Sequence, residues 1–243
     1  MASNKWPVGI GKRRACVSQE RNLGVLIVML EKLSTPGFET ISTPDSDTCT
    51  LVKTILDNGN VSPTIAEIGI GIGTTTQAVA KILNNRGQLH VFDLENKVAE
   101  VVSDLAGMGF SNVTPYPNST RYWDSYNWSL MKLMKANEGA IYDLIYLDGA
   151  HTFFHDALAF VLCDRLLKVG GYMISDDYYW TFAKSRYMAD KRDQFMTSEQ
   201  IETRQVALVV DLLVASNPQY EVVTKNKVYK KVLPTPVRAT QTR

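Results

Sequence analysis

The chain has 243 residues, of which 45% are hydrophobic and 9% aromatic, and its 26 basic residues nearly balance its 25 acidic ones. This length and apolar content suffice for the core of one domain, and a net charge of +1 produces no field that would attract nucleic acid. The three cysteines form no C-x-x-C pair, and their odd number argues against a disulfide framework. No apolar run resembles a secretory leader or is long enough to span a bilayer, which predicts a cytoplasmic protein without a membrane partner.

The N-terminal part, residues 1–48, is expected to be an extension of the main domain. Apolar residues recur at helical spacing over residues 17–33, which predicts a helix. Residues 34–47 are rich in Ser, Thr, Pro and Asp and have no periodicity, so they are expected to form a loop. This extension could act as a lid, and in a homodimer it could cover the site of the neighbouring subunit.

From residue 49 to residue 233, apolar runs of strand length alternate with stretches of helical periodicity. This alternation predicts a parallel sheet with helices on both faces and right-handed crossovers. Two last runs, 220–224 and 227–232, flank Lys225-Asn226 and predict a hairpin, whereas residues 234–243 are expected to be a disordered tail. The predicted strands are 64–68, 88–93, 112–116, 142–147 and 171–175; the predicted helices are 48–58, the stretch after the glycines to 84, 96–108, a segment ending near 136, 152–168 and 198–215.

Three alternating glycines follow the first predicted strand and precede a predicted helix. Glycine permits a sharp turn there and lets backbone N–H groups approach a ligand. A dinucleotide fingerprint G-x-G-x-x-G that starts at Gly69 or Gly71 needs glycine at position 74 or 76, where this chain has threonine. Pyrophosphate recognition is therefore disfavoured. A carboxylate two residues before the first glycine, at Glu67, instead suits a ligand that carries a cation.

The pattern acid-x-Gly-x-Gly-x-Gly resembles motif I of the class I S-adenosylmethionine-dependent methyltransferases, and its residues are Glu67, Gly69, Gly71 and Gly73. The resemblance implies a Rossmann-like α/β domain over residues 49–233. Its doubly wound, mostly parallel seven-stranded sheet would have the strand order 3-2-1-4-5-7-6, with the last strand antiparallel. The implied cofactor is S-adenosylmethionine (SAM), bound by the motif together with Thr74 and Thr75.

Two further positions complete the cofactor site that this resemblance implies. Asp93 ends the second predicted strand, twenty residues after Gly73, where the family places an acid that bonds both ribose hydroxyls. Glu95 is a nearby competitor for this role. In the polar turn after the third strand, Asn118 or Ser119 would contact the adenine, although an ordinary Asx turn explains the same residues.

Carboxylates also end the fourth and fifth predicted strands, at Asp148 and at Asp176-Asp177. Strand ends of a parallel sheet lie at one edge, and three carboxylates there would repel one another unless a cation intervened. Their spacing resembles that of catechol-type and small bacterial metal-dependent O-methyltransferases, which implies Mg²⁺ held by Asp148, Asp176 and Asp177. Alternatively, Asp148 contacts the cofactor or substrate while the other two cap a loop.

His151 follows Asp148 by three residues, and its imidazole could accept a hydroxyl proton near neutral pH. A lone histidine is more often structural, and His90 and His155 are interpreted in that way. One departure from the family is Ala150, because some sugar O-methyltransferases carry a carboxylate there. Aromatic groups after the third and fifth strands could border an apolar substrate or belong to the core.

Together these features predict SAM-dependent methylation of a hydroxyl on a small molecule, with Asp148 and His151 as catalytic residues and a divalent ion that chelates vicinal oxygens. A metal-independent O- or N-methyltransferase and a non-catalytic SAM-binding protein remain alternatives. Methylation of nucleic-acid bases is disfavoured, because the fourth strand ends in Asp-Gly-Ala-His and not in Asp/Asn-Pro-Pro-aromatic.

Overall fold

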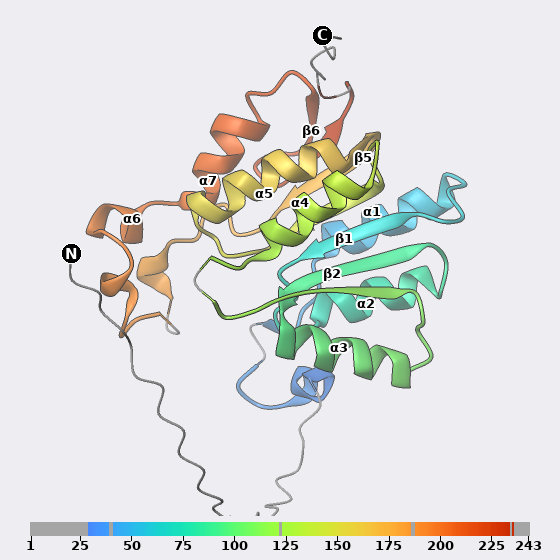
Figure 1. Ribbon diagram of the computed structural model, residues 1–243, viewed down its shortest axis with the longest axis horizontal. Coiled ribbons are helices and arrows are strands. Elements are labelled where there is room, and N and C mark those ends of the chain that lie inside the picture. The colour runs from blue at the N-terminus through green and yellow to red at the C-terminus, as the bar shows by residue number, and fades with distance from the viewer. Residues whose placement is uncertain (1–28, 39–40, 122, 186–187, 234, 236–243) are drawn as a thin grey trace, which may run out of the picture.

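A seven-stranded sheet is the centre of the computed structural model, which describes residues 29–38, 41–121, 123–185, 188–233 and 235 (Figure 1). Its order is β3-β2-β1-β4-β5-β7-β6. Strands β1 to β5 pair in parallel, and β7 runs antiparallel to both β5 and β6. The predicted fold class and strand order are confirmed. The strands are β1 (Thr64–Ile68), β2 (Gln88–Leu94), β3 (Val113–Asn118), β4 (Tyr142–Leu147), β5 (Leu167–Ser175), β6 (Tyr220–Thr224) and β7 (Val228–Lys231).

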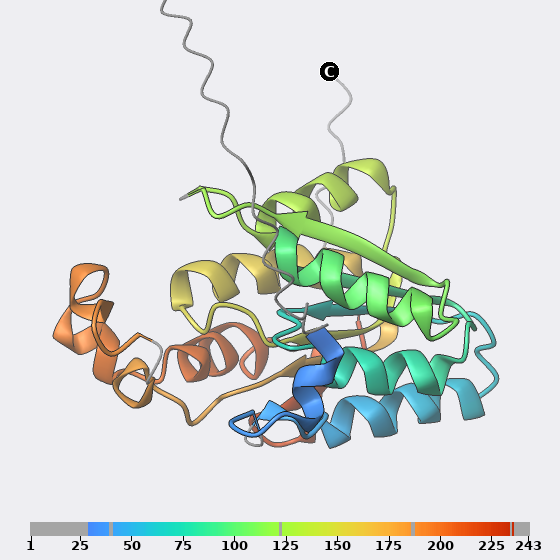
Figure 2. The ribbon, with the colours of Figure 1, turned by 90° about the horizontal axis from the view of Figure 1, so that it is seen from below.

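Helices cover both faces of the sheet (Figures 1 and 2). On one face lie α1 (Ser46–Asp57), α2 (Thr74–Leu83) and α3 (Glu95–Gly107), and on the other lie α4 (Tyr126–Ala136), α5 (Phe153–Leu166) and α7 (Gln205–Val209). Each face has its own buried apolar cluster. The central strands are apolar at nearly every position because helices pack on both sides of them.

The segment after β5 differs from the sequence prediction. The single helix predicted over residues 198–215 is wrong, because the chain forms α6 (Ser198–Glu202), α7 and a π-helical turn η5 (Val210–Val214). Thr203 ends α6 with an extended backbone, and its hydroxyl donates to the Glu199 carbonyl over 2.6 Å. The bond satisfies one of the carbonyls at the helix end, where the chain changes direction. Two short 3₁₀ helices precede α6: η3 (Phe182–Lys184) and η4 (Arg192–Gln194).

At the N-terminal side, the described residues begin with a 3₁₀ helix, η1 (Met29–Ser34). The remainder of the helix predicted over residues 17–33 lies outside the described residues, as does all but residue 235 of the tail predicted over 234–243. The predicted boundary between residues 48 and 49 falls inside α1. None of the helices within the described ranges combines the length and apolar character needed to cross a membrane.

The predicted C-terminal hairpin is confirmed. Asn226 adopts a left-handed backbone with φ of 64°, and the Lys227 N–H donates to the Thr224 carbonyl over 3.1 Å. Asparagine tolerates this conformation better than most residues, so the sequence is suited to the tight turn. The hairpin places Lys227 near the carboxyl end of β5, because its carbonyl accepts from the Ser175 N–H over 2.9 Å.

Candidate active site

The glycine turn between β1 and α2 brings the ends of β1 and β4 into close contact. Gly69 has a φ of 86°, and a Cβ atom at this position would lie 1.8 Å from the Asp148 carbonyl oxygen. Gly73 also has a left-handed backbone and is the N-cap of α2. Side chains larger than hydrogen would strain or block this turn, so the glycines are what allow the strand ends to converge.

Two neighbouring cavities lie at the carboxyl ends of the strands and share Gly71, Asp148 and His151. The first, which we call the β2–β3 cavity, has a volume of ≈ 390 Å³ and includes Asp93 and Asn118. The second, the β1–β4 cavity, has a volume of ≈ 490 Å³. Its acidic lining residues are Asp45, Glu67, Asp148, Asp176 and Asp177. This is the edge of a doubly wound sheet at which ligands bind.

Asp93 is fixed at the edge of the β2–β3 cavity. Its Oδ2 accepts from the Ile70 N–H over 3.0 Å and from the Lys97 ammonium over 3.2 Å, and its Oδ1 accepts from the Leu94 N–H over 2.6 Å. Glu95, the competitor, is exposed at the start of α3. The geometry therefore favours Asp93 as the acid that meets a ligand.

The two residues proposed to contact the adenine, Asn118 and Ser119, have different environments in the turn after β3. Asn118 lines the β2–β3 cavity, and its Oδ1 is buried without a hydrogen-bond partner in the described part of the chain. Ser119 donates through both its N–H, over 2.8 Å, and its hydroxyl, over 2.7 Å, to Asp124. Asp124 lines the cavity while Ser119 serves to hold it. Lys97, Asp124 and Ser125 also line this cavity and were missed from the sequence, whereas Tyr126, which lines it too, belongs to the aromatic group after the third strand.

Thr74 and Thr75 hold the preceding loop onto the glycine turn. The Thr74 hydroxyl donates to the Ile41 carbonyl over 2.7 Å, and the Thr75 hydroxyl accepts from the Asp45 N–H over 3.0 Å. Lys227 forms ion pairs with Asp45 and with Asp47, the latter at 3.0 Å. Both threonines line the β1–β4 cavity, so the loop closes one side of it.

Glu67 is buried in the β1–β4 cavity. It is 3% exposed, and its Oε2 has no hydrogen-bond partner among the residues described. Burial raises the pKa of its carboxyl from 4.5 to about 8, with a contribution from the negative charges of Asp93 and Asp45. A buried carboxylate oxygen without a partner is unfavourable, so this position is suited to a cationic ligand.

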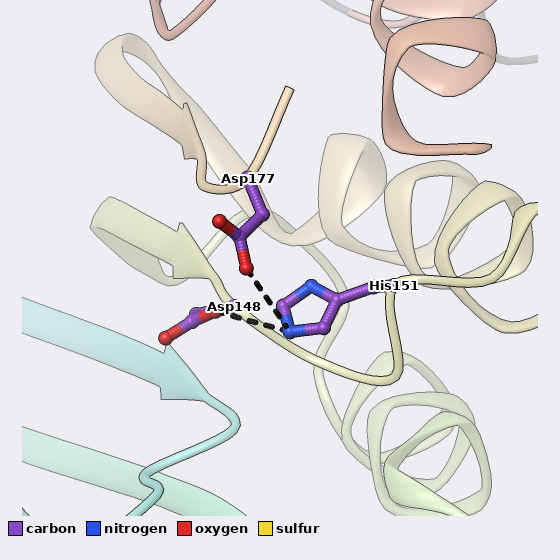
Figure 3. Close-up of side chains that lie close together, drawn as sticks. All are labelled: Asp148, His151 and Asp177. Carbon is purple, nitrogen blue, oxygen red and sulfur yellow. Dashed lines mark ion pairs between the residues drawn. The ribbon is translucent and has the colours of Figure 1, made fainter. Parts of the chain in front are cut away.

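Asp148, His151 and Asp177 point toward one another from the ends of β4 and β5 (Figure 3). The His151 Nε2 lies 3.5 Å from Asp148 Oδ1 and 3.6 Å from Asp177 Oδ2. Burial, together with Asp176, Asp177 and Glu67, raises the pKa of Asp148 well above its ordinary value. Burial also raises the pKa of Asp177. We call these three residues the ligand triad.

Asp176, which the sequence predicted as a metal ligand, does not belong to the ligand triad. Its Oδ2 accepts a 2.7 Å hydrogen bond from the Tyr146 hydroxyl, which also lies 3.4 Å from Asp148 Oδ2. The ligand-type atoms that gather within 4.8 Å of one another come from Asp148, His151 and Asp177. His151 thus stands where the sequence suggested Asp176.

The loops that carry the ligand triad are held in uncommon conformations. His151 and Asp177 have φ values of 54° and 58°, in the left-handed region that costs energy for residues with a Cβ atom. The Tyr126 hydroxyl accepts from the Ala150 N–H over 3.2 Å and donates to buried Asp156 over 2.6 Å. This buried pair fixes the β4–α5 loop.

The aromatic residues after the third and fifth strands have several different environments. Tyr126 is buried and Trp180 packs against the His151 ring at 5.3 Å, whereas Trp123 and Trp128 are 80% and 60% exposed. Tyr122 lies outside the described residues. Of the other histidines, His90 contacts the Tyr142 hydroxyl at 2.9 Å and His155 contacts Thr152 at 2.8 Å, as structural residues would.

Comparisons with known proteins agree with this architecture. Residues 66–178 match the family model described as a methyltransferase domain, while no curated protein matches the chain. The O-methyltransferase from Bacillus cereus, solved with S-adenosylhomocysteine, has a TM-score of 0.52 at 16% identity, over 86% of this chain and 94% of that one. TomG from Streptomyces achromogenes, solved with SAM, has a TM-score of 0.52 at 17% identity, over 84% of this chain and 89% of that one.

The match over residues 66–178, together with the sheet order, defines this part of the chain as a methyltransferase domain with the class I fold, the fold that motif I implied together with SAM as methyl donor. This protein is therefore a SAM-dependent methyltransferase with the fold of the small bacterial O-methyltransferases, as motif I predicted.

Proposed function

We propose that this enzyme transfers the methyl group of SAM to a hydroxyl group of a small molecule, with the assistance of a divalent ion. The observation that carries the proposal is the ligand triad, which lies beside the glycine turn in the β1–β4 cavity. An acceptor with two vicinal oxygens suits such a site, because one ion can contact both oxygens. The near-neutral charge of the chain argues against a nucleic-acid acceptor.

The two cavities together support a proposed arrangement of SAM. Asp93, which is held by two backbone N–H groups, would accept hydrogen bonds from the ribose hydroxyls. The unpaired Oδ1 of Asn118 would accept from the adenine amino group. Glu67 would face the ammonium group of the methionine moiety, whose positive charge would return the buried carboxyl to its ionised form.

The proposed reaction needs alignment and removal of one proton. The acceptor oxygen forms a bond to the methyl carbon as the C–S bond breaks, and the sulfur keeps the electron pair. The acceptor O–H loses its proton to solvent, so the products are the methyl ether, S-adenosylhomocysteine (SAH) and a proton. A divalent ion, when bound at this site, would supply positive charge and so lower the pKa of the acceptor hydroxyl. Asp148 and Asp177 would hold the ion, and their fixed loops would hold the acceptor in line with the methyl group.

A metal-independent methyltransferase is the second candidate, because the His151 Nε2 faces the same cavity and could accept the proton itself. The two roles of this nitrogen exclude each other, since one lone pair holds either an ion or a proton. In the metal-independent case, an acceptor with a single hydroxyl or an amine becomes suitable.

The test is SAH formation by the full chain, measured by mass spectrometry with catechols and sugar diols as acceptors. Their monohydroxy analogues are the matched controls. We expect turnover of the diols with a divalent ion and its loss with EDTA. Undiminished turnover in EDTA, or turnover of the analogues alone, would favour the second candidate. SAH binding without any turnover would indicate a non-catalytic SAM-binding protein.

A further inference from the structure

We infer that His151 is a metal ligand and not the proton acceptor, and that the site takes an ion such as Co²⁺ or Zn²⁺ in preference to Mg²⁺. The ion would be held by Asp148, His151 and Asp177, with Asp176 outside this set. The inference gives the proposed function a defined metal site and rests on it for the use of the ion, but it concerns metal binding, which is measurable without turnover.

The distances around the His151 Nε2 fit a shared ion. Ligands about 2.1 Å from one ion lie about 3.0 Å apart at a right angle and about 3.4 Å apart at the tetrahedral angle. The observed separations are 3.5 Å to Asp148 and 3.6 Å to Asp177, close to the tetrahedral value. Three protein ligands of this kind leave a fourth position free, as in catalytic zinc sites.

Hydrogen bonding explains the same arrangement less well. Both separations exceed the 2.7–3.2 Å typical of an N–H···O bond. Moreover, Nε2 carries at most one proton, which can point at only one of the two carboxylates. A single ion contacted by the three side chains would satisfy all of them at once.

Asp176 has a different partner. It accepts from the Tyr146 hydroxyl at 2.7 Å, so one of its oxygens is already engaged. Tyr146 also lies near Asp148, at 3.4 Å, and its hydroxyl separates the two carboxylates. We therefore assign Asp176 and Tyr146 the task of orienting Asp148 rather than of binding the ion.

The charge balance of the β1–β4 cavity also supports a cation here. Of the five carboxylates that line the β1–β4 cavity, Asp45 is balanced by Lys227. The buried Oε2 of Glu67 has no hydrogen-bond partner in the part of the chain that is described. SAM brings one ammonium and one sulfonium but also a carboxylate, so it offsets only part of this charge. A divalent ion would balance much of the remaining charge.

The ligand types determine which ion fits. Mg²⁺ prefers an octahedral shell of oxygen atoms and keeps several waters, whereas imidazole nitrogen suits Zn²⁺ and neighbouring transition metals. A set of two carboxylates and one imidazole therefore favours a transition-metal ion over the Mg²⁺ suggested by the sequence. The ordinary order of affinities also places Co²⁺ and Zn²⁺ well above ions without d electrons such as Mg²⁺.

The experiment titrates the EDTA-treated full chain with CoCl₂ or MgCl₂ in a calorimeter, without SAM or acceptor. We compare the wild type with His151→Asn, which tolerates the left-handed backbone at this position. The matched control is Asp176→Asn, which removes a carboxylate from the same cavity. We expect a Kd for Co²⁺ at least about tenfold below that for Mg²⁺ in the wild type.

The variants separate the possible ligand sets. His151→Asn should raise the Co²⁺ Kd about tenfold or more and leave the Mg²⁺ Kd within about threefold. Asp176→Asn should leave the Co²⁺ Kd within about threefold, because the asparagine amide oxygen can still accept the hydrogen bond from Tyr146 that orients the site. An unchanged Co²⁺ Kd in His151→Asn, or an equal loss in Asp176→Asn, would overturn the inference. SAH affinity and thermal unfolding show whether each variant is folded. If His151→Asn does not fold, X-ray absorption of the Co²⁺-bound wild type decides: imidazole scattering supports the ligand role, and its absence refutes it.

Failure of this inference differs from failure of the proposed function. Tight Co²⁺ binding through His151 with no methyl transfer to any diol would leave the metal site intact and refute the proposed reaction. Methyl transfer that requires an ion bound without His151 would do the reverse.

Discussion

Replacement of Gly69 by alanine should destabilise the protein more than the same replacement at Gly71. Both glycines have left-handed backbones, with φ values of 86° and 55°, so alanine at either position carries a strain of about 1–2 kcal/mol. The two differ in their surroundings. A Cβ at Gly71 would meet no heavy atom within 4 Å, whereas at Gly69 it would lie 1.8 Å from the Asp148 carbonyl oxygen and 2.6 Å from its carbon.

The contact at Gly69 is with backbone, which has no rotamer to change. Ordinary contact begins at 3.4 Å, so the ends of β1 and β4 would have to separate by about 1.6 Å. Overpacking of this kind costs about 1–3 kcal/mol. We therefore expect Gly69→Ala to lower the free energy of unfolding by about 2–5 kcal/mol, and Gly71→Ala by about 1–2 kcal/mol.

Urea denaturation followed by tryptophan fluorescence measures both losses, with the m-value as a check on two-state behaviour. Equal stability of the two variants would refute the reasoning, because the close approach of β1 to β4 would then not depend on the missing side chain. SAH affinity does not distinguish them, since both residues line the β2–β3 cavity.

Three further predictions concern single side chains. Burial raises the pKa of Glu67 from 4.5 to about 8 in the folded chain, so the folded state retains a proton that the unfolded state loses, and the free energy of unfolding should fall between about pH 4.5 and pH 8. In urea unfolding at several pH values, Glu67→Gln should flatten this part of the profile, and an unaltered slope would contradict the assignment. Lys231 is 2% exposed and lies 3.0 Å from Asp164, so Lys231→Met should cost about 3–5 kcal/mol in urea unfolding by leaving a buried carboxylate without its counterion, while Lys225→Met, on an exposed turn, should change little. Asp93→Asn should weaken SAH binding in calorimetry by about tenfold or more, with Glu95→Gln as the control that stays near wild type; the reverse order would make Glu95 the ribose ligand.

The strands could be predicted closely because their signal is local. β1 and β4 have the bounds that their apolar runs predict, and the ends of the other parallel strands differ from prediction by a few residues. Strands covered by helices on both sides must be apolar at almost every position, and the glycines mark where the first one ends. The break in the helix predicted over residues 198–215 was not predictable in this way, because an apolar periodicity continues across Thr203.

The sequence indicated which residues line the candidate site, but it did not indicate which of them contact one another. Glu67, Asp93, Asn118 and Asp148 all line the cavities at the sheet edge, as their places at or near strand ends suggest. Ser119 instead holds Asp124, a residue that no spacing marked. The sequence also offered Asp176 and Asp177 as equal partners for Asp148.

Composition, apolar periodicity and the motif from Glu67 to Gly73 determined by themselves the fold class, the expected cofactor and the sheet edge at which the candidate site lies, because each depends on residues close together in the chain. Which side chains meet at that edge was decided only by the tertiary structure. The left-handed backbones at His151 and Asp177 turn these two side chains toward Asp148, while Asp176 instead accepts a hydrogen bond from Tyr146 on the neighbouring strand. Spacing along the chain does not encode the direction in which a loop side chain points, since that direction follows from contacts between distant segments.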